Sequence, residues 1–288
     1  MDRRGCAAVS NRKHLASPPR SRAVRDFVPY KGATMFLKTA DADIFVTDLG
    51  QAGSKTVLAH GGWVGSGELW HQPFEQLSRR WRCVTYDHRG TGATRHRGGP
   101  ITQQMLVDDL FRVLDALQVE RCILAGESMG GVTVLQALLR APERFSGLVL
   151  VGARYQGQLS EGARKLVAGC KADFPATMRA FVNACTPEED CEAEREWAFR
   201  IVMRSNAEDA AQLLECMGDV DLTPRLCEIS VPTLLIHGRR DVIRPMSDSE
   251  FLQSHIAGSR LVPFENAGHV PTITRPTAVA AQIEAFFA

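Results

Sequence analysis

The feature that most constrains this chain is a serine framed by glycines, Gly126-x-Ser128-x-Gly130. An apolar run typical of a buried strand precedes it at residues 121–125, and apolar residues follow it at helical spacing. In a turn this tight from strand to helix, side chains at Gly126 or Gly130 would collide with their neighbours, and the central residue is strained. The frame is a nucleophile-elbow pattern, and it predicts that the hydroxyl of Ser128 is exposed.

Strand and helix patterns alternate along the chain from about residue 35. We expect strands at 35–38, 44–48, 55–59, 82–86, 121–125, 148–151, 233–237 and 260–264. Helices are expected at 68–77, after the capping residue Thr102, after the elbow, at 247–255 and at 277–287. This alternation predicts an α/β fold, a mostly parallel doubly wound sheet flanked by helices, with its functional site at the carboxyl ends of the strands.

A long stretch between two of these strands lacks a strand pattern. Residues 153–230 contain three segments with helical periodicity, at 162–171, 175–184 and 192–203. We therefore expect a core formed by residues 35–152 and 231–288, with 153–230 inserted as a helical cap. The cap contains nine basic and fourteen acidic residues, a field that disfavours a polyanionic substrate.

The first 34 residues differ in composition from the rest. They are rich in Arg, Ser and Pro, have no apolar signal core, and carry eight Lys or Arg against Asp2 and Asp26. Such a composition offers little to pack, so we expect residues 1–34 to be disordered. A targeting signal, an upstream-extended start and a true extension all remain open.

Composition excludes several classes of protein. The formal charge of +1 argues against a dedicated nucleic-acid binder, and no apolar run reaches the roughly 20 residues of a membrane span. None of the eight cysteines forms a C-x-x-C pair, so no zinc or other metal site is expected. We expect free thiols, a reducing compartment and hence a cytoplasmic location.

A serine hydroxyl is a weak nucleophile and needs a base together with an acid that orients it. His269 follows the strand at 260–264 in a loop bounded by Gly268 and Pro271. Asp241 follows the strand at 233–237, whereas the exit of the strand before it, at 152–154, has no carboxylate. The order Ser128, Asp241, His269 is that of the α/β-hydrolase triad.

From residue 35 to the end, the sequence resembles the α/β-hydrolase fold family. The matching motifs are His60-Gly61-Gly62, Asp87-x-x-Gly90-x-Gly92, Gly126-x-Ser128-x-Gly130, Gly238-x-x-Asp241 and Gly268-His269. The resemblance implies an oxyanion hole formed by the backbone N–H groups of Gly62 and Met129. It also implies that Asp87 and Arg89 brace the turn after their strand and that residues 153–230 cover the pocket.

Other side chains are weaker candidates for contact with substrate. Arg154 follows a strand and could meet a substrate carboxylate, although the sequence favours a surface ion pair. The aromatic candidates for an apolar pocket are Trp63, Phe181, Trp197 and Phe199. Glu127, beside the nucleophile, is interpreted as a structural hydrogen-bonding group.

These observations predict a serine hydrolase that cleaves a small to medium carboxylic ester or thioester through an acyl-enzyme, without a cofactor. Its partner is then a small-molecule substrate, and its oligomeric state is open. Two alternatives remain at this stage. A carbon–carbon bond hydrolase or a tailoring thioesterase could use the same triad, and a ligand receptor could retain the fold and use the cap as a switch.

Overall fold

The structure is a computed structural model that describes residues 32–51, 55–218 and 220–288. Most of the segment expected to be disordered, residues 1–31, lies outside the described residues. The first strand begins at Ala33, two residues earlier than expected, because residues 33 and 34 already pair with Asp48 and Thr47.

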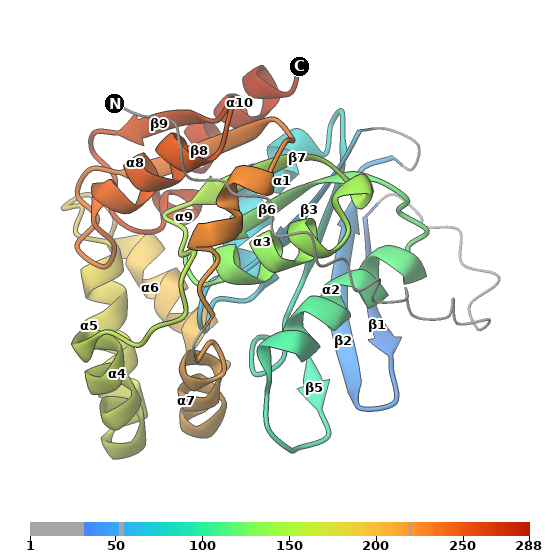
Figure 1. Ribbon diagram of the computed structural model, residues 1–288. Coiled ribbons are helices and arrows are strands. Elements are labelled where there is room, and N and C mark those ends of the chain that lie inside the picture. The colour runs from blue at the N-terminus through green and yellow to red at the C-terminus, as the bar shows by residue number, and fades with distance from the viewer. Residues whose placement is uncertain (1–31, 52–54, 219) are drawn as a thin grey trace.

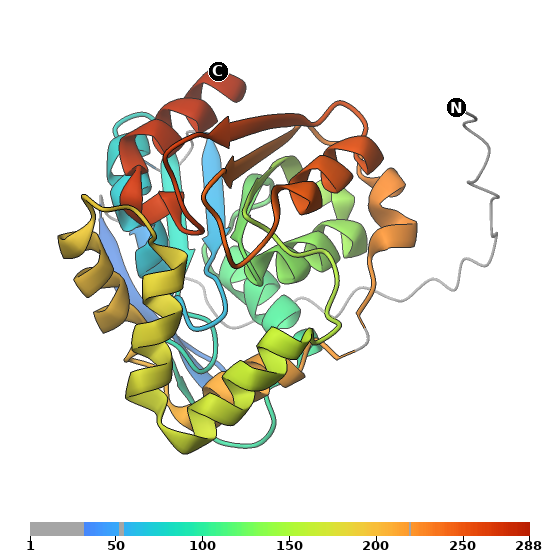
Figure 2. The same ribbon diagram turned by 90° about the vertical axis from the view of Figure 1, so that its left-hand side faces the viewer.

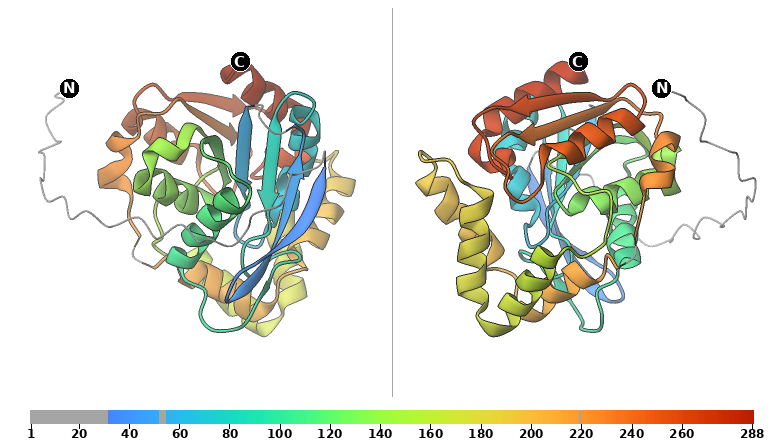
Figure 3. Two further views of the ribbon diagram at one scale, coloured as in Figure 1. Left: turned by 90° about the vertical axis from the view of Figure 1, so that its right-hand side faces the viewer. Right: turned by 60° about the vertical axis from the view of Figure 1, so that its left-hand side comes forward.

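A nine-stranded sheet forms the centre of the described part of the chain. Its strands are β1 (Ala33–Lys38), β2 (Ala42–Leu49), β3 (Thr56–His60), β4 (Arg82–Tyr86), β5 (Arg95–His96), β6 (Cys122–Glu127), β7 (Phe145–Val151), β8 (Thr233–Gly238) and β9 (Arg260–Phe264). The spatial order is β1-β2-β4-β3-β6-β7-β8-β9, and the short β5 pairs with β2. Only the pairings made by β2 are antiparallel; from β4 to β9 the described strands run parallel (Figure 3).

Helices cover both faces of this sheet, as the alternation of patterns predicts. One face packs against α2 (Gln103–Ala116), α3 (Gly130–Arg140) and α8 (Met246–His255), and the other against α1 (His71–Leu77) and α10 (Pro276–Phe286). Successive residues of β7 belong to opposite cores: Leu148 and Leu150 to the first, Val149 and Val151 to the second. Both faces of the strand are therefore buried, which explains its continuous apolar sequence.

In the described residues, four α-helices lie between β7 and β8. They are α4 (Glu161–Ala172), α5 (Phe174–Cys185), α6 (Glu192–Val202) and α7 (Ala207–Glu215), followed by the 3-10 helix η3 (Thr223–Glu228). They gather at one end of the molecule, away from α10 and the C-terminus (Figures 1 and 2). A bridge between Gln156 and Asp221 joins the two ends of this segment, which we call the cap.

Several helices differ from the sequence-based expectation, among them α7 and α1. α7 was not anticipated; Asn206 caps it by accepting from the N–H groups of Glu208 and Asp209. The helix expected at 68–77 is divided into the 3-10 helix η1 (Gly67–Trp70) and α1. Pro73 has no N–H to donate to the carbonyl of Leu69, so a continuous helix would lack a hydrogen bond at this point.

The cysteines of the described part form no disulfide bonds with one another, and Cys83 and Cys122 lie buried in core strands. None of the helices in residues 32–51, 55–218 and 220–288 is long and apolar enough to cross a membrane.

A buried ion pair and hydrogen bonds to a buried carboxylate fix the turn at the carboxyl end of β4. Arg89 is 1% exposed, and its Nε donates to Asp109 Oδ2 at 2.6 Å, while its Nη2 contacts Asp41 at 3.0 Å. Asp87 accepts from the N–H groups of Gly67 at 3.0 Å and Ala93 at 2.7 Å. Asp87 and Arg89 therefore brace the turn after β4, the role that the resemblance implied.

We expect Asp109→Ala to lower the free energy of unfolding by about 3–5 kcal/mol, because it leaves the buried Arg89 guanidinium without its main counter-charge. Glu284→Ala is the control, since Glu284 pairs with Arg80 at the surface and such pairs contribute about 1 kcal/mol or less. Urea unfolding of both variants measures the difference. Equal losses would contradict this account of the turn.

Candidate active site

The candidate site lies where the carboxyl ends of four parallel strands meet. Gly62 follows β3, Ser128 follows β6, Asp241 follows β8 and His269 follows β9. β3 and β6 are neighbours, as are β8 and β9, so residues far apart in the sequence reach the same edge of the sheet.

The turn at Ser128 has the strained geometry that the glycine frame predicts. Ser128 has a φ of 52°, in the left-handed region that non-glycine residues rarely adopt. A Cβ at Gly130 would lie 2.2 Å from the carbonyl oxygen of Gly61, and one at Gly126 would lie 2.5 Å from Val134 Cγ2. Only glycine fits at both positions.

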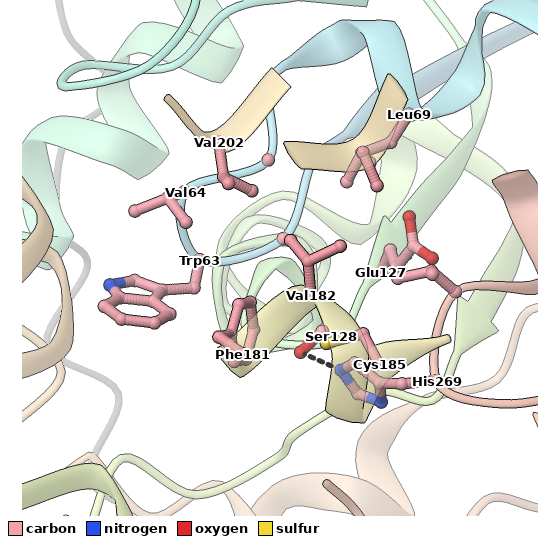
Figure 4. A pocket seen from close by; sticks show the side chains of 14 residues that line it. Trp63, Val64, Leu69, Glu127, Ser128, Phe181, Val182, Cys185, Val202 and His269 are labelled. Carbon is pink, nitrogen blue, oxygen red and sulfur yellow. Dashed lines mark hydrogen bonds between the residues drawn. The ribbon is translucent and has the colours of Figure 1, made fainter. Parts of the chain in front are cut away.

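A continuous chain of hydrogen bonds joins the three predicted side chains. His269 Nε2 lies 2.8 Å from Ser128 Oγ, and His269 Nδ1 lies 2.7 Å from Asp241 Oδ2 (Figure 4 marks the first of these bonds). Because a carboxylate only accepts, Nδ1 carries the proton and donates it to Asp241. Nε2 is then left unprotonated and accepts from the Ser128 hydroxyl.

The surroundings of Asp241 favour its charged form. Its side chain is 1% exposed, and Oδ1 accepts from the N–H groups of Ile243 at 2.8 Å and Arg244 at 2.9 Å. Burial by itself would raise the pKa of Asp241. The electrostatic interaction with His269 and hydrogen bonds from His237, His269 and the backbone outweigh burial and hold that pKa well below its ordinary value.

The two predicted oxyanion-hole residues lie close to the nucleophile. A Cβ at Gly62 would lie 3.5 Å from Ser128 Cβ, so this backbone approaches the serine closely. Met129 is the N-cap of α3, at the helix end whose N–H groups have no intrahelical acceptor. The arrangement is compatible with two N–H donors directed at one substrate oxygen.

The sequence analysis did not identify His88 as part of this site. Its Nε2 lies 2.9 Å from the carbonyl oxygen of Gly62 and its Nδ1 lies 3.0 Å from that of Arg89. The ring is 1% exposed and packs 4.7 Å from the ring of His60. His88 thus links the turn after β4 to the turn after β3. The signal in the sequence that could have identified His88 is its position just after β4, the strand that neighbours β3.

A small, mostly apolar cavity opens beside Ser128 (Figure 4). Its volume is about 40 Å³. The lining residues are Gly62, Trp63, Val64, Gly65, Leu69, Glu127, Ser128, Phe181, Val182, Cys185, Ala198, Val202, His269 and Val270. Trp63 and Phe181 meet edge to face with ring centroids 5.0 Å apart, so a core side chain and a cap side chain form one wall.

Three of the weaker candidates are not among the described residues that line this cavity, and their contacts explain why. The Arg154 guanidinium donates to the carbonyls of Gln156 and Gln158. Trp197 Nε1 donates to Glu68 Oε1 at 2.7 Å. The Phe199 ring packs against Arg179, whose guanidinium carbon lies 3.5 Å from the ring centroid. These three side chains therefore do not line this cavity, and a substrate-binding role for them stays a prediction.

Glu127 is fully buried beside the nucleophile. Its Oε1 accepts from Thr272 Oγ1 at 2.7 Å, and its Oε2 has no hydrogen-bond partner among the described residues. Burial raises the pKa of the Glu127 carboxyl to about 8, despite the Thr272 hydrogen bond, and the charge of Asp241 adds to the increase. The hydrogen bond from Thr272 agrees with the structural interpretation of Glu127, and the raised pKa favours the protonated carboxyl at neutral pH. No cluster of three or more His, Cys, Asp or Glu side chains suited to a metal occurs in residues 32–51, 55–218 and 220–288.

We expect Glu127 to make stability dependent on pH. The unfolded carboxyl loses its proton near pH 4.3, about 4 pH units before the buried one, so the folded state holds the extra proton in between. The free energy of unfolding then falls as pH rises through this window, by up to about 1.4 kcal/mol per unit. Glu127→Gln keeps the acceptor for Thr272 and removes the titration.

Urea unfolding at about pH 5.5 and about pH 8 measures this effect. The stability of Glu127→Gln relative to the wild type should be higher at about pH 8 than at about pH 5.5, and the exposed Glu75→Gln variant serves as the control. Parallel pH curves for Glu127→Gln and the wild type would show that the buried carboxyl does not titrate in this range.

Comparison with known proteins indicates the same family as the fold and the elbow motif. A family model described as alpha/beta hydrolase fold matches residues 55–210. The chain is 28% identical over 255 residues to 3-oxoadipate enol-lactonase 2 of Acinetobacter baylyi, covering 86% of this chain and 94% of the relative. It is 29% identical over 237 residues to the pimeloyl-[acyl-carrier protein] methyl ester esterase of Nitrosomonas europaea, covering 78% and 92% respectively.

Solved structures agree with this match. A hydrolase from Pseudomonas aeruginosa superposes with a TM-score of 0.80 at 29% identity, over 88% of this chain and 98% of that one. An esterase from Exiguobacterium antarcticum has a TM-score of 0.81 at 24% identity, over 88% and 99%, which speaks for the fold alone. The family model spans more than half of the chain, and the chain therefore belongs to the α/β-hydrolase fold family.

Proposed function

We propose that this α/β-hydrolase is a serine esterase or thioesterase that acts through an acyl-enzyme on a small to medium, uncharged substrate. The observation that carries the proposal is the unbroken hydrogen-bond chain from Asp241 through His269 to Ser128, which ends beside an apolar cavity. The names of the relatives add support, since they include an enol-lactonase and a methyl ester esterase. Those names favour an ester bond over a carbon–carbon bond.

In the proposed reaction, His269 Nε2 removes the proton from Ser128 Oγ as that oxygen attacks the carbonyl carbon of the substrate. The carbonyl oxygen becomes negatively charged, and the N–H groups of Gly62 and Met129 stabilise it. Loss of one such donor typically costs about 10²–10³-fold in turnover. The carboxylate of Asp241 stabilises the imidazolium that forms.

Collapse of this intermediate expels the alcohol or thiol, which takes its proton from His269 Nε2, and leaves the acyl group on Ser128. Water then attacks the acyl carbon while His269 takes its proton, and collapse of the second intermediate returns that proton to Ser128 Oγ and releases the carboxylic acid. These steps use only groups of this chain and water, so the proposed cycle requires no metal or organic cofactor.

The cavity and the cap support the choice of substrate class. The lining is apolar apart from Ser128, His269 and the neutral Glu127, so a charged acyl group would lose its hydration without a partner. We propose that residues 153–230 act as the cap that selects the acyl group, because Phe181, Val182 and Cys185 of α5 lie in the wall. The small volume favours a short chain.

We expect Ser128→Ala to abolish turnover of short acyl esters and Asp241→Asn to reduce it by about 10⁴-fold, because the asparagine leaves His269 in the wrong tautomer. Steady-state rates with acetyl and butyryl esters and thioesters, together with melting temperatures, measure these effects. An exposed aspartate away from the site, Asp115→Asn, is the control. If Asp241→Asn kept more than a tenth of the wild-type rate, another group would have to orient His269.

The same cavity predicts the effect of enlarging its wall. Phe181→Ala should shift preference toward longer acyl chains and raise kcat/KM for them relative to acetyl esters, because it removes the side chain that meets Trp63. Phe199→Ala is a matched control, a cap phenylalanine outside the described lining. Rates across a series of acyl lengths compare the two. An identical profile for both variants would contradict the assignment of Phe181 to the acyl site.

A further inference from the structure

The loop that carries His269 is attached directly to the cap. The N–H of Gly268 donates to Glu188 Oε1 at 2.8 Å, and the N–H of His269 donates to the carbonyl oxygen of Cys185 at 2.8 Å. Both acceptors belong to residues 185–188, which comprise the last residue of α5 and the segment after it. Two consecutive amides at the proposed general base therefore depend on cap groups for their hydrogen bonds.

Glu188 also reaches the far side of this loop. Its Oε1 accepts from Thr274 Oγ1 at 2.9 Å, in the short helix α9 (Pro271–Thr274). Glu188 is 1% exposed, so these bonds are shielded from water. One carboxylate oxygen thus joins the residue before His269 to the end of the helix after it.

Packing leaves little freedom between the two segments. A Cβ at Gly268 would lie 2.3 Å from Pro187 Cδ and 2.6 Å from the carbonyl oxygen of Cys185. Arg240, next to Asp241, donates to the carbonyl of Pro187 at 3.0 Å. The loop of the acid and the loop of the base both contact residues 185–188.

Within the cap, this segment is itself held in place. Arg195 of α6 donates to the carbonyl oxygen of Thr186 at 3.0 Å and to that of Glu188 at 2.6 Å. Thr186 is fully buried, and its hydroxyl donates to the carbonyl of Val182 at 2.8 Å. The acceptors that face His269 are therefore fixed by the helices of the cap.

We propose that Glu188 is a positioning residue that fixes His269 for catalysis, so that the cap controls the placement of the general base as well as the choice of substrate. This inference rests on the proposed function, in which His269 acts on Ser128. A displacement of about 1 Å in a catalytic group can cost about 10²-fold in rate. Glu188 touches neither substrate nor reacting atoms and acts only through the His269 loop.

Three variants test the proposal in the full-length protein. Glu188→Ala removes the acceptor and should lower kcat by about 10- to 100-fold with KM changed less than about twofold, because the base is displaced while the cavity is kept. Glu188→Gln keeps an oxygen acceptor of the same reach and should restore kcat to within about threefold. Thr274→Val removes one of the two bonds at similar volume and should give an intermediate loss.

A spectroscopic signal separates positioning from folding. The proton between His269 Nδ1 and Asp241 should give a low-field proton resonance in the wild type and in Glu188→Gln, and a shifted or broadened one in Glu188→Ala. Asn206→Ala is the control for a loss of stability in the cap segment. It removes the N-terminal capping side chain of α7, which has no hydrogen bond to the His269 loop among the described residues. It should lower the melting temperature and leave the resonance and kcat unchanged.

Two results would overturn the proposal. The first is a wild-type kcat in Glu188→Ala. The second is a decrease in kcat that tracks the decrease in melting temperature equally in Glu188→Ala and Asn206→Ala, with the resonance unchanged in both. If Glu188→Ala does not fold, wild-type kcat in Thr274→Val would have the same consequence. Failure of the proposed function is distinguishable, because it would appear as turnover that survives Ser128→Ala in an otherwise wild-type chain.

Discussion

The close approach of the β3 and β6 turns is the constraint on which the site depends. Gly130 lies against the carbonyl of Gly61, and the positive φ of Ser128 turns the chain at once from β6 into α3. That packing brings the Ser128 hydroxyl beside Gly62 and the start of a helix, where backbone N–H groups are available. A side chain at Gly130 would push the turn with Gly62, a proposed oxyanion donor, away from the nucleophile, so the strained turn and the proposed chemistry depend on the same contact.

Electrostatics separates the roles of two buried carboxyls at this edge of the sheet. Asp241 receives hydrogen bonds from two backbone N–H groups and from His269, which keep it ionised, whereas Glu127 has one hydroxyl partner and holds its proton. A second negative charge beneath Ser128 would oppose formation of the oxyanion. An ionised Asp241 and a protonated Glu127 are thus compatible with a proposed triad in which Asp241 is the only carboxylate.

The sequence analysis could predict the fold and the positions of Ser128, Asp241 and His269, because carboxyl ends of parallel strands meet at one edge and each residue directly follows a strand. It missed His88 and Glu188, whose roles arise from contacts between segments distant in the sequence. For the same reason it could not separate Phe181, which reaches the cavity, from Trp197 and Phe199, which pack elsewhere in the cap. Helical periodicity indicates that a face is buried, but not what buries it.

Reaction with a fluorophosphonate, followed by intact-mass spectrometry and peptide mapping, tests the central claim most directly. Such a reagent phosphonylates a base-activated serine beside an oxyanion hole. The account predicts a single adduct per chain, located on Ser128, that forms rapidly in the wild type and is absent from Ser128→Ala. Labelling of Ser128→Ala at the wild-type rate, or an adduct on another residue, would contradict the assignment of Ser128 as the nucleophile.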